Sequence, residues 1–339
     1  MYRLFLLASL AVLLFPETPL PPHDRITTTV FFNREVVRIF QKKCLMCHNE
    51  KSVSMPLTTY EFARPWARAI REEVLARHIP PWRAVQGYGE FANDISLSPY
   101  ESELLLSWAD GGAPKGDMLV AAPKASVAPK PSLTVKMEKP ESIASGSAVQ
   151  VKQFTLPVRA TREQSLRAIE FRPGDARVVR AAFLYLNDRD HWLGGWTPWQ
   201  TRIAFPSAAG LTITPQSQLI LDVVYSGADG EGVQDTSQVL LFTDAVKRAR
   251  VIKSTTFSTE TDIPLAARAL ALRVESSTET PVEVKVIRPD GSSDVLLWLK
   301  NLDPNWPSAY VFDSPVLLEK GSKLKVYSRN PVKVTLNTM

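Results

Sequence analysis

The sequence predicts a multidomain α + β protein, in which a small all-α domain precedes two antiparallel β-sandwich domains. The chain has 339 residues, which exceeds the usual size of a single domain. Residues 27–117 carry apolar side chains at helical spacing. From Leu133 onward, short runs such as Val282-Glu283-Val284-Lys285-Val286 alternate apolar and polar side chains between turns such as Pro289-Asp290-Gly291.

Composition sets the boundaries of these domains. The helical pattern ends near Asp117, and residues 118–132 are rich in Ala, Pro, Lys and Ser, which is typical of a solvated linker. The strand pattern then covers residues 133–248 and 249–339, so we expect the two β-domains to meet near residue 250.

The first residues have the form of an export signal. Arg3 precedes an apolar run from Leu4 to Phe15, which Pro16 closes, and this run is too short to span a bilayer comfortably. No small-x-small cleavage site follows the run. We therefore expect residues 1–22 to be either a signal peptide or an uncleaved N-terminal anchor. The protein is expected to be periplasmic or secreted, either free or tethered to the membrane.

The charge pattern excludes one class of partner. The formal charge is +5, from 40 basic and 35 acidic residues, and no block of consecutive Lys or Arg occurs. Nucleic acid is therefore not an expected partner. A mildly basic surface suits an acidic redox partner or an anionic lipid surface.

The only cysteines of the chain are Cys44 and Cys47, and His48 follows them directly. This Cys-x-x-Cys-His pattern is typical of c-type haem attachment. Two thiols three residues apart on a helical turn can bond to the two vinyl groups on one porphyrin edge, and the next residue presents its imidazole to the iron. The alternatives are a thioredoxin-like pair, which needs a βαβ context, and a zinc site, which needs a second ligand pair. The sequence thus predicts one covalent haem c, held by Cys44 and Cys47, with His48 as the proximal iron ligand.

Three helices are expected around this motif. The first is capped by Asn33 and delivers Cys44 one turn beyond its end. The second begins near Pro65, and the third opens with a capping box at Ser98 and stops at Gly111.

The sixth iron position has three candidate ligands, Met55, His78 and Met118. His78 is favoured as the distal ligand because it continues the apolar stripe of its helix. A solvated histidine is the alternative for His78. Met55 is close to the haem motif in sequence, and a methionine that fills an apolar gap is the alternative there.

The stretch from Cys44 to Asp117 resembles a bacterial cytochrome c domain that precedes copper-dependent ascorbate monooxygenase-like domains. The resemblance rests on Cys44 to His48, Pro56-Leu57-Thr58-Thr59-Tyr60, Pro80-Pro81-Trp82, Phe91-Ala92-Asn93-Asp94, Leu97-Ser98 and Trp108 through Gly112-Ala113-Pro114-Lys115-Gly116-Asp117. Family members usually carry Met-Pro-Pro-Trp, with the methionine as a distal ligand. Ile79 stands at that position here, so the resemblance leaves His78, Met55 or no side chain at all for the iron.

The rest of the chain resembles the two jelly-roll-like β-sandwiches of copper type II, ascorbate-dependent monooxygenases such as peptidylglycine hydroxylases. The matching pieces are Phe171-Arg172-Pro173-Gly174, Leu193-Gly194-Gly195-Trp196-Thr197-Pro198, Asp222-Val223-Val224-Tyr225, Asp235-Thr236-Ser237, and Pro289-Asp290-Gly291 through Trp306 and Tyr310. Where the active family has its histidine ligands, this chain has Arg180-Ala181, Val224-Tyr225 and Leu270-Ala271-Leu272-Arg273. The resemblance therefore implies degenerate domains.

A count of histidines agrees with this reading. The chain has four, at positions 23, 48, 78 and 191, and only His191 follows residue 120. A type II copper centre relies on imidazole ligands, so no copper and no copper monooxygenase activity are expected. His191 is expected to be a surface loop residue.

These observations predict an extracytoplasmic c-type cytochrome that transfers single electrons and is not an enzyme. The β-domains would dock an unidentified redox partner protein. One alternative is a haem enzyme or sensor with an open iron coordination position. Another is a partner-binding module that uses Trp192, Trp196 and Trp199 as an exposed aromatic platform, although these side chains also suit a buried core.

Overall fold

The computed structural model describes residues 26–339, except for residue 53 and the segments 118–128, 229 and 247–249. The predicted leader at residues 1–22 and the candidate ligand Met118 therefore lie outside the described residues, as does most of the predicted linker. Within the described part of the chain, no helix is both long enough and apolar enough to cross a membrane.

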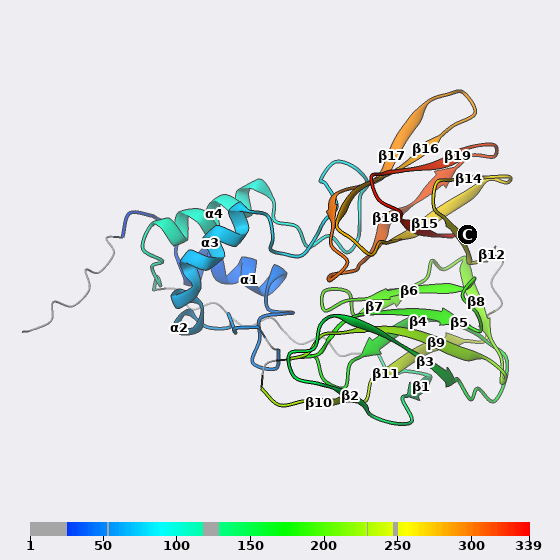
Figure 1. Cartoon of the computed structure of the whole chain (residues 1–339), viewed down its shortest axis with the longest axis horizontal. Coiled ribbons are helices and arrows are strands. Elements are labelled where there is room, and N and C mark those ends of the chain that lie inside the picture. The colour runs from blue at the N-terminus through cyan, green and yellow to red at the C-terminus, as the bar shows by residue number, and fades with distance from the viewer. Residues whose placement is uncertain (1–25, 53, 118–128, 229, 247–249) are drawn as a thin grey trace, which may run out of the picture.

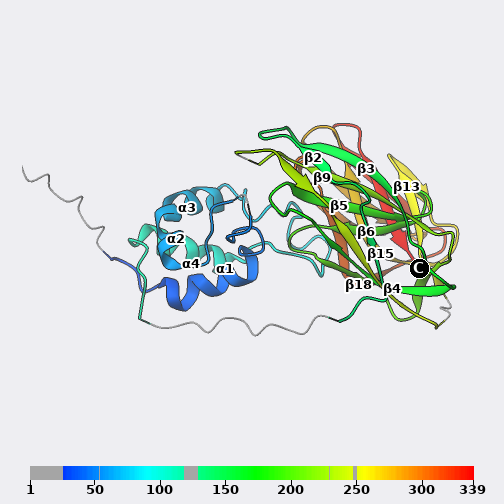
Figure 2. The same ribbon diagram turned by 90° about the horizontal axis from the view of Figure 1, so that it is seen from below.

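The helices lie at the N-terminal end of the chain and form one lobe of the molecule (Figures 1 and 2). Their bounds are η1 Phe32–Val36, α1 Val37–Lys43, α2 Tyr60–Ala63, η2 Arg64–Trp66, α3 Ala67–Leu75 and α4 Pro99–Asp110. Phe40 and Trp108 are both buried and meet edge to face in the core of this lobe, with their ring centroids 6.4 Å apart.

The helix starts show where local signals decide the structure. Ser98 caps α4 as predicted, because its side chain accepts from the Glu101 N–H and Glu101 accepts from the Ser98 N–H. The predicted Asn33 cap is wrong. The helical segment η1 already begins at Phe32, so Asn33 lies inside it. The Asn33 side chain instead donates to the Gly116 carbonyl at 3.0 Å.

The predicted start of the second helix at Pro65 is also wrong. Thr59 caps the chain earlier by accepting from the Phe62 N–H, and Pro65 lies inside a 3-10 turn that joins α2 to α3. Trp66, at the end of this 3-10 turn, is 42% exposed. The apolar side of α3 consists of Ala67, Ile70 and Val74.

The middle of the chain forms two larger sheets and one small one. Their strands are β1 Leu133–Lys136, β2 Glu141–Ile143, β3 Gln150–Pro157, β4 Gln164–Arg172, β5 Val179–Leu186, β6 Trp192–Trp196, β7 Arg202–Ala204, β8 Ala209–Ile213, β9 Gln218–Tyr225, β10 Val233–Asp235, β11 Gln238–Asp244 and β12 Arg250–Val251. One sheet has the order β1-β11-β4-β8-β12 with β7 paired to β4, another has the order β3-β9-β5-β6, and β10 pairs with β2. Leu166 and Ile169 of the first sheet share one buried cluster with Leu184 and Leu221 of the second.

The C-terminal strands form two further four-stranded sheets around a second cluster. Their bounds are β13 Lys253–Phe257, β14 Glu260–Asp262, β15 Ala267–Glu275, β16 Thr280–Ile287, β17 Ser293–Leu302, β18 Ala309–Leu318, β19 Lys323–Ser328 and β20 Lys333–Thr338. The orders are β13-β20-β15-β18 and β14-β19-β16-β17. Leu272 and Leu336 from the former sheet pack with Val284 and Leu324 from the latter.

The described chain is thus rich in β-strands, with several mainly antiparallel sheets and few helices, and at this level the predicted α + β class is confirmed. The one parallel pair among the described ladders joins β12 to β8.

One connection leaves the helices and packs into the C-terminal sheets. Between α3 and α4, Trp82, Phe91 and Ile95 belong to the same buried cluster as Leu272 and its neighbours. The Val85 N–H donates to the Trp298 carbonyl at 2.8 Å, which ties the backbone of the connection to β17. In Figure 1 this segment is the cyan loop beside β17 and β18. The connection between α3 and α4 is therefore part of the core of the C-terminal sheets, which is separate from the core of the helices.

Candidate functional site around Cys44, Cys47 and His48

Cys44, Cys47 and His48 occupy one turn directly after α1. The Cys44 N–H still donates to the Phe40 carbonyl at 2.8 Å, so the helix delivers the motif. The N–H groups of Cys47 and His48 both donate to the Cys44 carbonyl, at 3.0 and 2.9 Å. The structure therefore brings the three predicted site residues together, and all three are half-buried.

Both thiols are free, and neither has the character of a reactive thiolate. Burial, together with the charges of Cys47 and Glu101, raises the pKa of Cys44 to about 12. Burial also raises the pKa of Cys47 to about 12. Catalytic dithiols lie in surroundings that lower the thiol pKa, so this environment does not favour a thioredoxin-like pair.

A zinc site finds no second ligand set near the motif. In residues 26–339, outside the undescribed segments, no group of three or more His, Cys, Asp or Glu side chains could hold a metal ion. A structural zinc site normally uses four such ligands.

His48 is oriented by the backbone of Met55. Its Nδ1 lies 3.0 Å from the Met55 carbonyl oxygen, and a carbonyl can only accept, so Nδ1 carries the proton. Metal-ligating histidines are typically held in this way by the ring nitrogen that does not bind the metal. Burial lowers the pKa of His48, which keeps the imidazole neutral, and its Nε2 lone pair is left for a ligand.

The surroundings of the motif suit a large apolar group. Half-buried apolar side chains pack against the same core of the helical lobe as Cys44, and they include Leu45, Met55, Tyr60, Ile79, Leu97 and Leu104. When a further apolar surface covers such side chains, the free energy falls by about 25 cal/mol for each Å² of apolar surface removed from water. Two thiols, one neutral imidazole and these apolar side chains are residues that fit a c-type haem.

The two described candidates for the sixth ligand lie in different places. Met55 packs against the same apolar cluster as Cys44, but its carbonyl is already bonded to His48. His78 lies on the turn after α3, where its side chain is 62% exposed and its Nδ1 is 3.0 Å from a Glu73 carboxylate oxygen.

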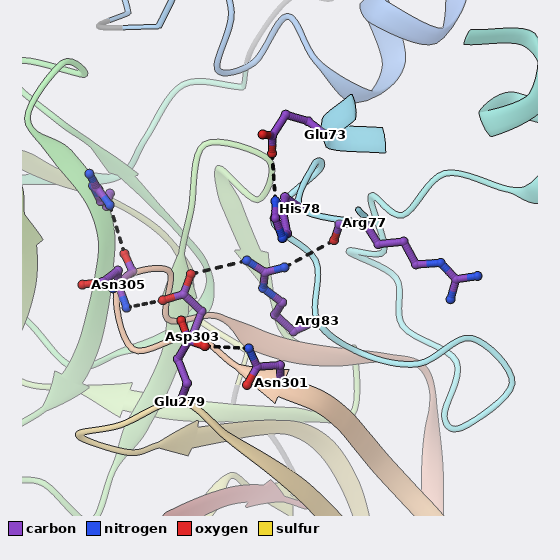
Figure 3. A network of polar contacts seen from close by, with 9 residues as sticks. Glu73, Arg77, His78, Arg83, Glu279, Asn301, Asp303 and Asn305 are labelled. Atoms are coloured by element: carbon purple, nitrogen blue, oxygen red, sulfur yellow. Dashed lines mark hydrogen bonds and ion pairs between the residues drawn. The ribbon is translucent and has the colours of Figure 1, made fainter. Parts of the chain in front are cut away.

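A polar network that the sequence did not indicate joins the His78 turn to the C-terminal sheets (Figure 3). The Arg83 guanidinium lies 3.4 Å from the Asp303 carboxylate, and both side chains are largely buried. Arg83 also donates to the Arg77 carbonyl at 3.4 Å. Because Arg83 and Asp303 are distant in sequence, no local pattern signals their pairing. This network fixes the chain next to His78 and does not surround a metal.

Structural contacts occupy the positions where the resemblance implied copper ligands. Arg180 donates to Ser226 at 2.9 Å and lies over the Trp306 ring, 4.7 Å from its centroid. Tyr225 donates to the buried Asp235 carboxylate at 2.7 Å. Arg273 is buried and donates to the Tyr185 hydroxyl.

The remaining aromatic and histidine candidates also have definite places. His191 is half-exposed on the turn before β6, where Nδ1 lies 2.6 Å from an Asp188 carboxylate oxygen, as expected for a surface loop residue. Trp192 and Trp196 are buried, and Trp199 packs against the C-terminal core. The alternative of an exposed platform from these tryptophans is therefore wrong, and the expectation that they suit a buried core is confirmed for Trp192 and Trp196.

Comparisons with known proteins add little to this geometry. No protein-family model matches the sequence, and no curated protein matches it. A match among solved structures is the major capsid protein P2 of bacteriophage PM2, with 12% sequence identity and a TM-score of 0.29, over 61% of this chain and 96% of that one. Another is a protein described as an alpha-L-fucosidase of Bacteroides ovatus, with 12% identity and a TM-score of 0.19, over 58% of this chain and 36% of that one. TM-scores this low support no argument about function.

Proposed function

We propose that the protein is an extracytoplasmic c-type cytochrome. Cys44 and Cys47 would hold one haem covalently, and His48 would bind the iron through Nε2. The observation that carries the proposal is the hydrogen bond from His48 Nδ1 to the Met55 carbonyl, because it prepares a neutral imidazole for a metal on the same turn as two free thiols. When bound, the haem supplies one-electron redox chemistry.

The residues of the chain would support this role in distinct ways. The Met55 carbonyl holds the His48 ring in one orientation. The apolar side chains that pack on this core, such as Leu97 and Leu104, would exclude water from a bound haem. Less water around an iron changes its reduction potential, so these side chains would tune the potential as well as the affinity.

A docking surface for an acidic redox partner lies along α1. A cleft of about 760 Å³ runs between α1, the start of α4 and the segment 86–96, and exposed Arg38 and Lys42 line it. Neither cation has a partner among the described residues. The carboxylates of the same cleft are already engaged in local hydrogen bonds, because Glu35, Asp94 and Glu101 accept from the N–H groups of Phe31, Ser96 and Ser98. The free charge that faces a partner is therefore positive.

In this proposal residues 27–117 act as the cytochrome domain, and the two pairs of sheets act as β-sandwiches that place the haem beside its partner. The occupied positions at Arg180, Tyr225 and Arg273 support a degenerate monooxygenase-like region without enzymatic activity. The apolar run behind Arg3 supports export.

The test is production of the whole chain in a host that matures c-type cytochromes. Intact-mass spectrometry should find the added mass of one haem, and absorbance should show a reversible haem c spectrum. Cys44→Ala with Cys47→Ala should remove the covalent haem, and His48→Ala should change the iron spectrum. His191→Ala is the matched control, because that imidazole is half-exposed and far along the chain. A wild-type protein without added porphyrin mass contradicts the proposal.

A further inference from the structure

The hydrogen bond between His48 and Met55 decides what the Met55 side chain can reach. The two ring nitrogens of an imidazole lie on opposite edges, and the Met55 carbonyl occupies the Nδ1 edge at 3.0 Å. A metal bound at Nε2 lies on the far side of the ring from Met55. A ligand trans to His48 lies beyond the metal, farther than one methionine side chain extends from its own carbonyl. Met55 is therefore a positioning residue and not the sixth ligand.

His78 is held away from the site on the outside of the molecule. Its side chain is 62% exposed and bonded to Glu73, and its N–H donates to the Glu73 carbonyl at 3.0 Å. It does not belong to the apolar cluster around Cys44, although its neighbour Ile79 does. To bind a metal through Nδ1, His78 would have to give up the Glu73 carboxylate.

The other described histidines and methionines are farther away or on the wrong side. His191 and Met137 lie in the part of the chain that forms the sheets of strands β1 to β12, and Met339 packs against the core of these sheets. Met46 lies between the two cysteines on the turn that carries His48, so it cannot lie opposite His48.

From this arrangement we propose that no side chain among the described residues takes the sixth position of the haem iron, and that a small diatomic ligand such as carbon monoxide can bind there. This inference rests on the proposed haem function. Ile79, Leu97 and Leu104, which pack against the same core as Cys44, are aliphatic and offer the iron no ligand atom. Carbon monoxide should therefore bind to the reduced iron.

The experiment uses the full-length, haem-loaded protein, reduced and mixed with carbon monoxide while absorbance is recorded. The expected result is a five-coordinate spectrum before mixing and complete conversion to the carbon monoxide form at once. Met55→Leu, which keeps the backbone carbonyl, and His78→Ala should both behave like wild type. Met118→Ala is included because residue 118 is not described.

One result would overturn the inference. A six-coordinate spectrum of the reduced protein that does not change with carbon monoxide would show a protein ligand, and the variant that restores binding would identify it. A preparation without any haem absorbance would instead reject the proposed function itself, and this outcome is distinguishable because no iron spectrum exists at all.

Discussion

Trp82, from the connection between two helices, lies edge to face against Tyr310 of β18, with the ring centroids 5.1 Å apart. Trp82 is only 7% exposed and Tyr310 only 2%. Next to this pair, the buried Asn93 amide donates to the Ala309 carbonyl at 2.7 Å and accepts from the Val311 N–H at 3.0 Å. The connection between α3 and α4 is therefore attached to the C-terminal sheets by a buried aromatic contact and by hydrogen bonds between the Asn93 side chain and the backbone of β18.

Trp82→Ala is expected to lower the free energy of unfolding by about 3–5 kcal/mol, because it leaves a large cavity between the connection and β18. Urea unfolding followed by circular dichroism measures the change. Trp66→Ala is the matched control, since that ring is 42% exposed and its loss should cost little. Equal effects of the two substitutions would contradict the burial of Trp82 in the core of the C-terminal sheets.

Tyr225→Phe is expected to destabilise the first group of sheets by about 1–3 kcal/mol, because the buried Asp235 carboxylate loses a donor. Ser237 and the Asp175 N–H continue to donate to Asp235, so folding itself should survive. Thermal or urea unfolding at neutral pH measures the loss. Tyr100→Phe is the control, because its ring is exposed on α4.

The stability of the protein at alkaline pH should depend on the same tyrosine. Burial and the hydrogen bond to Asp235 raise the pKa of Tyr225 above its ordinary value of 10.0. The unfolded chain then releases this proton at a lower pH than the folded protein. The contribution of Tyr225 to stability is therefore complete below about pH 10 and is lost as the pH rises further. Urea midpoints measured across this range should fall less steeply in Tyr225→Phe than in wild type, and identical slopes would contradict the assignment.

Arg273→Leu is expected to loosen the contact between the two groups of sheets. The Arg273 guanidinium on β15 lies 3.5 Å from the Phe183 ring centroid on β5, and it is paired with Glu275 at 2.9 Å. Its removal leaves the buried Tyr185 hydroxyl without this donor, which costs about 1.5–3 kcal/mol. Limited proteolysis and urea unfolding measure the effect. Arg268→Leu, exposed on the same strand, should leave both unchanged.

Ile79→Met tests the distal side in the opposite direction. Ile79 is half-buried in the cluster that contains Cys44, and the family that the helical region resembles usually has methionine at this position. The new thioether is expected to bind the iron, give a six-coordinate spectrum and slow carbon monoxide binding strongly. Ile79→Leu is the control, because it has a similar volume and no ligand atom. Unchanged carbon monoxide binding in Ile79→Met would show that residue 79 does not face the iron.

Short-range signals in the sequence predicted the structure well where they were complete. The spacing of Cys44, Cys47 and His48 needs only one turn, and the Ser98 cap needs only its own helix, so both could be predicted. Asn33 failed as a cap because Gly116, far along the chain, engages its side chain.

Long-range packing was not predictable in the same way. The places of Trp82 and Phe91 in the sequence predict that they belong to the helical region. Apolar side chains can be buried in either core, however, and the structure buries both rings in the C-terminal one. The orientation of His48 depends on the backbone carbonyl of Met55. Every residue has such a carbonyl, so the sequence does not indicate which one accepts the hydrogen bond. The exposure of His78 depends on Glu73 and on the course of the turn after α3, which periodicity alone does not fix.

The insertion of residues 82–95 into the C-terminal core also bears on how the chain is completed. Ala309, whose carbonyl accepts from the Asn93 amide, is made 216 residues later than Asn93 itself. The connection between α3 and α4 must therefore wait in water, with its aromatic rings uncovered, until the last strands have been synthesised. A ribosome that stops before β18 therefore leaves Trp82 and Phe91 without the strand whose Tyr310 ring covers them.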